Sequence, residues 1–300
     1  MSEDLLRDCT LCPRACHINR LAGMKGKCGM ASELVVARAA LHMWEEPCIS
    51  GEAGSGTVFF SGCALGCVYC QNHNIAGGIA GKTITVGRLA EIFIELQQKG
   101  ANNINLVTPG HFIPQIKEAL IQGKKLGLTI PIVYNSSGYE RPEALQLLEG
   151  LIDIYLPDFK YMDSKIALRY SKAKDYTDYA KISMKEMFRQ VGKPVFSETG
   201  IMTKGMIVRH LILPGYMEDS KQILKYLYET YGDDIYISIM NQYTPLKNVE
   251  KYAEINRKLT EAEYDQVVDY GIELGIENGF IQEGETATES FIPEFNAEGV

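Results

Sequence analysis

Three cysteines stand close together in the stretch SGCALGCVYCQN, at Cys63, Cys67 and Cys70. Cysteine thiolates are the usual protein ligands of iron–sulfur clusters, and three of them can bind three irons of a 4Fe–4S cluster while the fourth iron stays open. An open metal position is typical of a reactive metal site rather than a structural one. Gly62 and Gly66 allow the loop to wrap closely around such a group. The spacing therefore predicts a reactive cluster, with a zinc site or unrelated thiols as the alternative.

Four more cysteines precede this run with the spacing C-x2-C-x3-C-x11-C, and they are Cys9, Cys12, Cys16 and Cys28. Four ligands can close a tetrahedral site that holds either zinc or a second iron–sulfur cluster. A segment this short rarely folds without a metal. We therefore expect residues 1–50 to form a small Cys-rich, metal-binding segment, with zinc and a cluster both open. The eighth cysteine, Cys48, stands alone, and we expect it to be a small buried residue.

The elements that must position these cysteines follow from the apolar pattern. From residue 56, short apolar runs alternate with segments of helical periodicity. Strands are expected at 57–62, 103–108, 130–136, 151–161, 206–215 and 234–242, and helices at 86–100, 112–127, 142–148, 163–173, 177–191, 219–232 and 260–275. About six βα units predict an α/β fold with a parallel sheet. A barrel and a doubly wound sheet share this pattern, and both carry their reactive loops at the carboxyl ends of the strands.

The composition narrows the class of protein. The net charge of −8 argues against a nucleic-acid partner, which needs a basic face. The opening MSEDLLRDCT has no apolar signal core, and no apolar run approaches the length of a membrane span. We therefore expect a cytoplasmic protein with neither a nucleic-acid nor a membrane partner. Disulfides are rare in that compartment, so eight cysteines indicate metal binding.

The triplet, with Tyr69 directly before its last cysteine, resembles the C-x3-C-x-aromatic-C cluster motif of the radical S-adenosylmethionine (radical SAM) superfamily. The resemblance implies a partial (β/α)6 barrel of the TIM type at 51–275, with residues 1–50 as an N-terminal Cys-rich knuckle and 276–300 as a tail. It implies a 4Fe–4S cluster whose open iron binds SAM. Reductive cleavage of SAM would give methionine and a 5′-deoxyadenosyl radical that abstracts a hydrogen atom. An electron donor such as flavodoxin or ferredoxin is implied as a partner.

Within that superfamily, residues 57–245 are similar to the pyruvate formate-lyase activating enzymes and their uncharacterised relatives. The similarity rests on LPDFK (156–160), on VRHLILPG (208–215) and on the polar turn in YNSSGY. Tyr69 would shield the cluster, and the residues that the resemblance places at the SAM site are Thr108, Asn135, Ser136, Asp158, Lys160 and Arg209.

Two stretches depart from the pattern of the activating enzymes. VTPGH (107–111) lacks their acid after the second strand, and IMNQYTP (239–245) lacks their histidine, so that Asn241 or Gln242 would take its place. The substrate is therefore open: the glycine of a glycyl-radical enzyme, another protein, or a small molecule. Two rival hypotheses are an iron–sulfur electron-transfer protein without SAM chemistry and a zinc-binding structural module.

Overall fold

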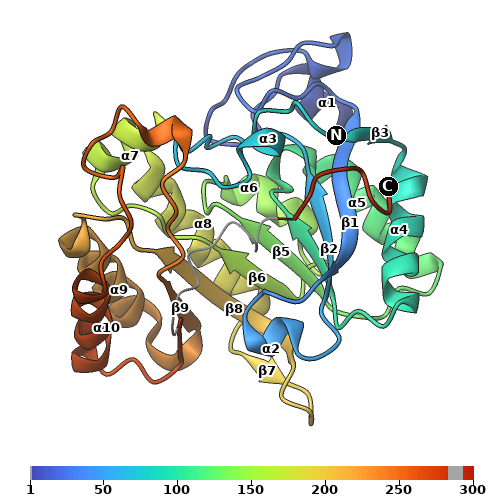
Figure 1. Ribbon diagram of the computed structural model, residues 1–300. Coiled ribbons are helices and arrows are strands. Elements are labelled where there is room, and N and C mark those ends of the chain that lie inside the picture. Colours follow the sequence, from blue (N-terminus) through green and yellow to red (C-terminus); the bar gives the residue numbers. More distant parts are fainter. Residues whose placement is uncertain (1, 283–292) are drawn as a thin grey trace.

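The computed structural model of the chain describes residues 2–282 and 293–300, so part of the expected tail at 276–300 lies outside the described residues (Figure 1). Its centre is a curved sheet with the strand order β10-β9-β8-β6-β5-β4-β2-β1-β3. Six neighbouring strands run parallel, and they are β2 (Ser55–Phe60), β4 (Ile104–Val107), β5 (Ile132–Ser136), β6 (Ile154–Pro157), β8 (Met202–Leu211) and β9 (Tyr236–Met240). The predicted α/β fold with a parallel sheet is confirmed.

The strand order distinguishes a barrel from a doubly wound sheet. The six parallel strands lie side by side in the order of the chain, whereas a doubly wound sheet reverses direction at a switch point. Sequential order is the arrangement of a TIM-type barrel. The strands at the two ends of this path, β3 (Lys82–Ile84) and β10 (Gly279–Ile281), do not pair with each other in the described part of the chain. The barrel is therefore partial and open on one side.

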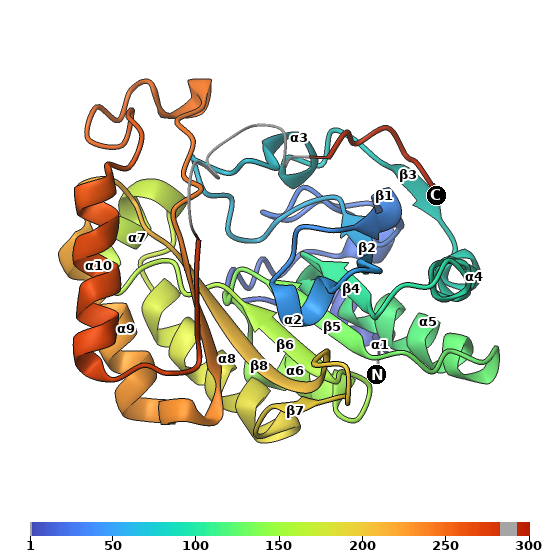
Figure 2. The same cartoon turned by 60° about the horizontal axis from the view of Figure 1, so that its bottom comes forward.

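Helices cover the outer, convex face of the sheet (Figure 2). They are α4 (Val86–Gln98), α5 (Ile113–Lys125), α6 (Pro142–Leu145), α7 (Ser164–Ser171), α8 (Tyr176–Val191), α9 (Met217–Tyr231) and α10 (Glu261–Leu274). The apolar stripe of α4 is buried as its periodicity predicts. Thr260 begins α10 with a capping box to Glu263. None of the helices in residues 2–282 and 293–300 is long and apolar enough to cross a membrane.

Further strands extend the sheet on both sides of the six parallel strands. On one side β1 (Leu34–His42) pairs antiparallel with β2 and with β3. On the other side β10 runs parallel to β9, while the short β7 (Val195–Phe196) pairs with β8. Two short helices are α1 (Ser2–Arg7) and α3 (His73–Ala76), of which α3 follows the cysteine triplet. The chain before residue 51 thus contributes a strand to the main sheet.

The short helix α2 (Pro47–Ser50) fills the interior of the barrel at the amino ends of the strands. Its residues Cys48 and Ile49 form one apolar cluster with five barrel residues, Val133, Ile154, Leu156, Met202 and Ile207. The side-chain amides of Asn102 and Asn103 donate to the carbonyls of Ser50 and Ile49. Cys48 is buried, as expected. With this end filled, space for a ligand is expected at the carboxyl ends of the strands.

Candidate active site

A cavity of about 400 Å³ opens at the carboxyl ends of the parallel strands. This volume is within the range of pockets that bind small molecules. All of the residues predicted for the cluster and the SAM site line the cavity, and they are Cys63, Cys67, Cys70, Tyr69, Thr108, Asn135, Ser136, Asp158, Lys160 and Arg209. They come from the ends of four strands, β4, β5, β6 and β8, and from the loop after β2, so the fold brings together residues almost 150 positions apart.

The cysteine triplet lies in the loop that follows β2, residues 61–72, which we call the cluster loop. All three cysteines are free, and burial raises the pKa of Cys63 to about 11 and that of Cys70 to about 12. The backbone N–H groups of Leu65 and Gly66 counteract this effect at the Cys63 sulfur. A metal that binds these half-buried thiols must displace their protons.

The three thiols of the cluster loop have the donor chemistry of an iron–sulfur site. Cys63, Cys67 and Cys70 all line one shared cavity, as the ligands of a multi-iron cluster do. The donor set therefore fits a 4Fe–4S cluster that lacks a fourth protein ligand.

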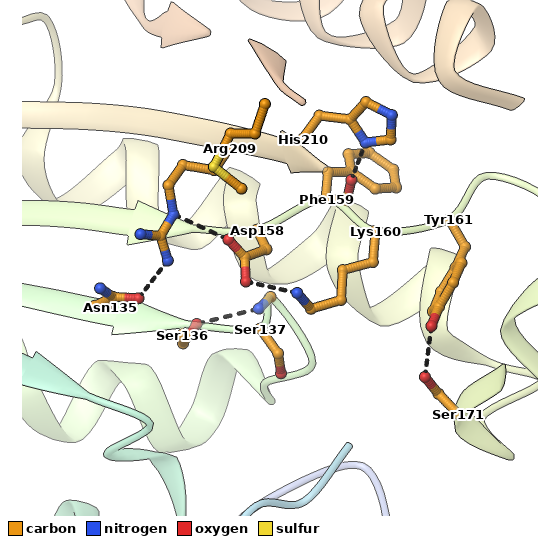
Figure 3. Close-up of polar contacts among 12 residues, drawn as sticks. Asn135, Ser136, Ser137, Asp158, Phe159, Lys160, Tyr161, Ser171, Arg209 and His210 are labelled. Carbon is orange, nitrogen blue, oxygen red and sulfur yellow. Dashed lines mark hydrogen bonds and ion pairs between the residues drawn. The ribbon is translucent and has the colours of Figure 1, made fainter. Parts of the chain in front are cut away.

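Asp158 is the centre of the polar network on the cavity wall (Figure 3). One carboxylate oxygen accepts from Arg209 Nε at 3.0 Å, and the other accepts from Lys160 Nζ at 2.8 Å. Arg209 Nη2 also donates to Asn135 Oδ1 at 2.6 Å. These side chains come from β5, β8 and the end of β6, so three neighbouring strands fix a row of alternating charges.

A carboxylate that was not predicted completes this network. Glu45 lies between β1 and α2, and one of its oxygens lies 3.2 Å from Arg209 Nη1. Its other oxygen accepts from Asn105 Nδ2 at 2.8 Å. Burial raises the pKa of Glu45, although Arg209 counteracts the shift. At Asp158 burial also acts to raise the pKa, but Lys160 and Arg209 outweigh it and hold the carboxylate in its charged form.

Thr108 has an unusual backbone conformation, with φ of +58°. A β-branched residue is rarely found in the left-handed region, where it costs about 1–3 kcal/mol, and such strain gathers at functional sites. Its N–H donates to the carbonyl of Asn135 at 2.9 Å, which ties the ends of β4 and β5 together. The strained residue is in the VTPGH stretch, where the sequence departs from the activating enzymes.

Other residues on the cavity wall bear on the stretch IMNQYTP (239–245), which lacks the histidine of the activating enzymes. Gln242 lines the cavity, and its carbonyl accepts from the side chain of Gln71 in the cluster loop. Asn241 instead hydrogen-bonds to Gln282 beside β10. Of the two candidates for the position of the missing histidine, Gln242 is therefore the one that reaches the cavity. Trp44 also lines the cavity and is 67% exposed.

The N-terminal cysteines lie near each other and are also free. Cys9, Cys12 and Cys28 are buried and Cys16 is half-buried. Burial raises the pKa of Cys12 to about 12, and the charges of Cys28 and Cys9 add to the increase. The thiols are thus within electrostatic reach of each other.

Known proteins resemble this chain in sequence and in fold. Residues 57–227, more than half of the chain, match the model of the radical SAM superfamily. An uncharacterized protein of Methanocaldococcus jannaschii is 28% identical over 276 residues, which are 90% of this chain and 75% of that protein.

Two solved structures share the fold at low sequence identity. Streptococcus suis SuiB bound to S-adenosylmethionine has a TM-score of 0.51 and 15% identity, over 75% of this chain and 49% of that one. HydG, a maturase of the FeFe-hydrogenase, has a TM-score of 0.51 and 14% identity, over 76% of this chain and 52% of that one. The chain spans about half the length of these two structures. By its match over residues 57–227, the chain belongs to the radical SAM superfamily.

Proposed function

We propose that Cys63, Cys67 and Cys70 hold a 4Fe–4S cluster and that the polar wall of the same cavity binds SAM. The observation that carries this proposal is that the three thiols share one cavity with Asp158 and Arg209. A bound cluster of this kind supplies the electron that cleaves SAM to a 5′-deoxyadenosyl radical. The protein contributes the ligands and a polar wall that orients SAM.

The strand-end residues have separate roles in this proposal. The cations Arg209 and Lys160 suit the carboxylate and the ribose hydroxyls of SAM, because both present N–H donors to the cavity. Asp158 orients both cations, and Asn135 fixes the guanidinium from the other side. Thr108, Ser136 and Tyr69 line the remaining wall near the cluster loop.

The experiment that tests this proposal is anaerobic reconstitution. We expect about four irons bound by the triplet, a reduced-cluster EPR signal that SAM perturbs, and formation of 5′-deoxyadenosine. The Cys67→Ala variant should lose all three. An electron-transfer protein would show the EPR signal without a response to SAM, and a zinc-binding module would show neither.

For the substrate we propose a protein, such as a glycyl-radical enzyme, that covers the open mouth of the barrel. Support comes from the similarity of 57–245 to the activating enzymes and from Trp44, an exposed aromatic residue at the cavity. A small molecule is the second candidate, because the partial barrel is open to solvent. Dialysis of a cell extract distinguishes the two candidates, because a protein is retained and a small molecule diffuses out. We expect the retained fraction to stimulate formation of 5′-deoxyadenosine. Stimulation by the diffusible fraction alone would overturn the choice of a protein.

We also propose that the electron donor, a flavodoxin or ferredoxin, docks beside Cys67. This cysteine lines a second cavity of about 450 Å³, together with Val68, Lys247, Asn248, Glu250 and Lys251. Cys67 thus lies between the SAM cavity and the surface. Two lysines at this opening suit a donor with an acidic face.

The metal of the N-terminal cysteines, the division of the chain at residues 50 and 275, and the cytoplasmic location stay predictions. Zinc, iron and sulfide per chain, compared between the wild type and a Cys12→Ala variant, test the N-terminal site. Loss of zinc alone would identify a zinc site, and loss of iron with sulfide would identify a second cluster.

A further inference from the structure

Arg14 lies between Cys12 and Cys16 and reaches from the N-terminal segment to the cluster loop. Its Nε donates to the carbonyl of Ala64 at 2.9 Å, and Nη2 donates to the carbonyl of Leu65 at 3.1 Å. These two carbonyls belong to the residues between the first and second cysteines of the triplet. A residue about 50 positions away in the sequence therefore fixes the backbone that separates Cys63 from Cys67.

The same guanidinium also holds the end of α7. It donates to the carbonyls of Ser171 and Lys172, at 2.8 Å and 2.5 Å. The last carbonyls of a helix have no partner within the helix, and a cation there is favourable. The cluster loop is tied to this point independently, because the N–H of Val68 donates to the carbonyl of Tyr170 at 2.8 Å. Arg14 thus joins three segments: the N-terminal segment, the cluster loop and α7.

Two further contacts place the N-terminal segment against the beginning of the cluster loop. Gly62 has φ of +91°, and a Cβ there would lie 2.7 Å from the carbonyl oxygen of Cys28 and 3.0 Å from His111 Nε2. His111 Nε2 lies 2.7 Å from the carbonyl of Ser61, and the fully buried Arg20 donates to the carbonyl of His111. The segment from Cys9 to Met30 therefore packs against the cluster loop.

We propose that Arg14 is a positioning residue for the catalytic cluster: its fork of hydrogen bonds sets the backbone between Cys63 and Cys67 and so the separation of the two thiols. The proposal rests on the proposed function only in taking this loop as the cluster site. A guanidinium offers five N–H donors in a fixed plane, and here it bonds four carbonyls at once. A lysine ammonium has three donors on a flexible stem and cannot reproduce this geometry.

The first test is amide hydrogen exchange in the full chain prepared without iron. We expect residues 63–68 to exchange roughly tenfold faster, or more, in Arg14→Ala, because the loss of one charge-assisted hydrogen bond already changes a local opening equilibrium by that factor. Arg14→Lys should resemble Arg14→Ala and not the wild type. Arg189→Ala is the matched control, since Arg189 also makes several hydrogen bonds, but to Glu149 and Glu186.

The second test measures the loaded protein. After reconstitution, iron release to a chelator should be about tenfold faster in Arg14→Ala, as expected when a residue that orients metal ligands is lost, and the EPR signal should broaden. The iron that Cys67→Ala protein retains is bound at other sites, and this amount is subtracted from the iron measured in the other variants.

Unchanged exchange and iron release in Arg14→Ala would overturn the proposal, and so would full rescue by Arg14→Lys, which would indicate that only the charge matters. If Arg14→Ala does not fold, the lysine variant alone decides. The exchange test reports on Arg14 whether or not the protein cleaves SAM.

Discussion

Asp158 is the single side chain on which most of the polar wall depends. Both of its oxygens are used, one by Arg209 and one by Lys160. Asp158 and Lys160 were placed at the SAM site by the resemblance of LPDFK to the activating enzymes. The partner Arg209 was predicted separately, from another strand, and the structure brings the two together.

We predict that Asp158→Asn weakens SAM binding about tenfold or more, because the amide loses one charge-assisted hydrogen bond and leaves both cations less well oriented. Equilibrium dialysis of SAM with the reconstituted protein measures the change. Asp233→Asn, a change at an exposed position of the 3-10 helix Gly232–Asp234, is the control. Equal affinities of wild type and Asp158→Asn would show that this carboxylate does not organise the SAM site.

Buried His210 predicts a dependence of stability on pH. Its ring nitrogens lie 2.7 Å from the Phe159 carbonyl and 2.8 Å from the Ser220 hydroxyl, and burial lowers its pKa from 6.5 to about 4. Between these values the unfolded chain binds a proton that the folded chain does not. The free energy of unfolding should therefore fall by about 1.4 kcal/mol for each pH unit as the pH drops through this window.

Urea unfolding of the wild type and of His210→Gln, at the two ends of that window, measures this contribution. The other titrating groups are common to both proteins, so the difference between the two slopes isolates His210. Parallel slopes would mean that the imidazole is protonated in the folded protein.

Glu45 is a residue of the polar network that could not be predicted from the sequence. The sequence contains thirty-eight acidic residues, and nothing in the spacing of Glu45 distinguishes it from the others. It reaches the cavity only because β1 pairs beside β2 and α2 turns into the barrel. Side chains placed by tertiary structure alone carry no local signal.

At the scale of the elements, the six parallel strands and the helices between them followed from periodicity, whereas β1 and α2 did not. The pairing of β1 with β2 shifts register between Val36 and Arg38, and such a bulge breaks the alternation by which a strand is recognised. The helix α2 has only four residues and is too short for a helical period. The choice between barrel and doubly wound sheet also needed the strand order, which periodicity does not contain.

The packing of α2 inside the barrel should contribute strongly to the stability of the fold. Ile49 is fully buried among the barrel residues, so Ile49→Ala should lower the free energy of unfolding by about 2–5 kcal/mol. Cys48→Ala removes a single sulfur atom from the same helix and should cost much less. Urea unfolding of both variants measures this, and a similar cost for the two would argue against tight packing of Ile49.

Cys48 also tests the assignment of metal ligands. It lies in an apolar cluster away from the cavity, so Cys48→Ala should keep the full iron content after reconstitution. Loss of iron in this variant would mean that the thiol is a ligand.

At the scale of the whole molecule, the opening beside Cys67 predicts how electrons enter. Lys247→Glu combined with Lys251→Glu should slow reduction by flavodoxin about tenfold or more at low ionic strength, because charge reversal at a docking site acts mainly on the association rate. Reduction by dithionite, a small reagent, should not change. The control pair is Lys185→Glu with Lys225→Glu on α8 and α9. Equal slowing by the control pair would indicate an effect of net charge alone.

The relation between the two groups of cysteines also belongs to this scale. Their spacings predicted two sites, and the sequence suggested a knuckle appended to the barrel. In the structure, contacts of Arg14, Arg20 and Cys28 place the N-terminal segment against the cluster loop. The spacing of residues in the sequence does not predict such contacts between distant segments, because the contacts are made to backbone carbonyls, which every residue has.

The most direct test of the central claim is single-turnover cleavage of SAM. The anaerobically reconstituted protein is reduced with dithionite and mixed with SAM, and 5′-deoxyadenosine is quantified beside the cluster EPR signal. We predict nucleoside formation and a SAM-dependent change of the signal in the wild type, and neither in Cys67→Ala. An intact, reducible cluster that gives no nucleoside and no spectral response to SAM would contradict the account.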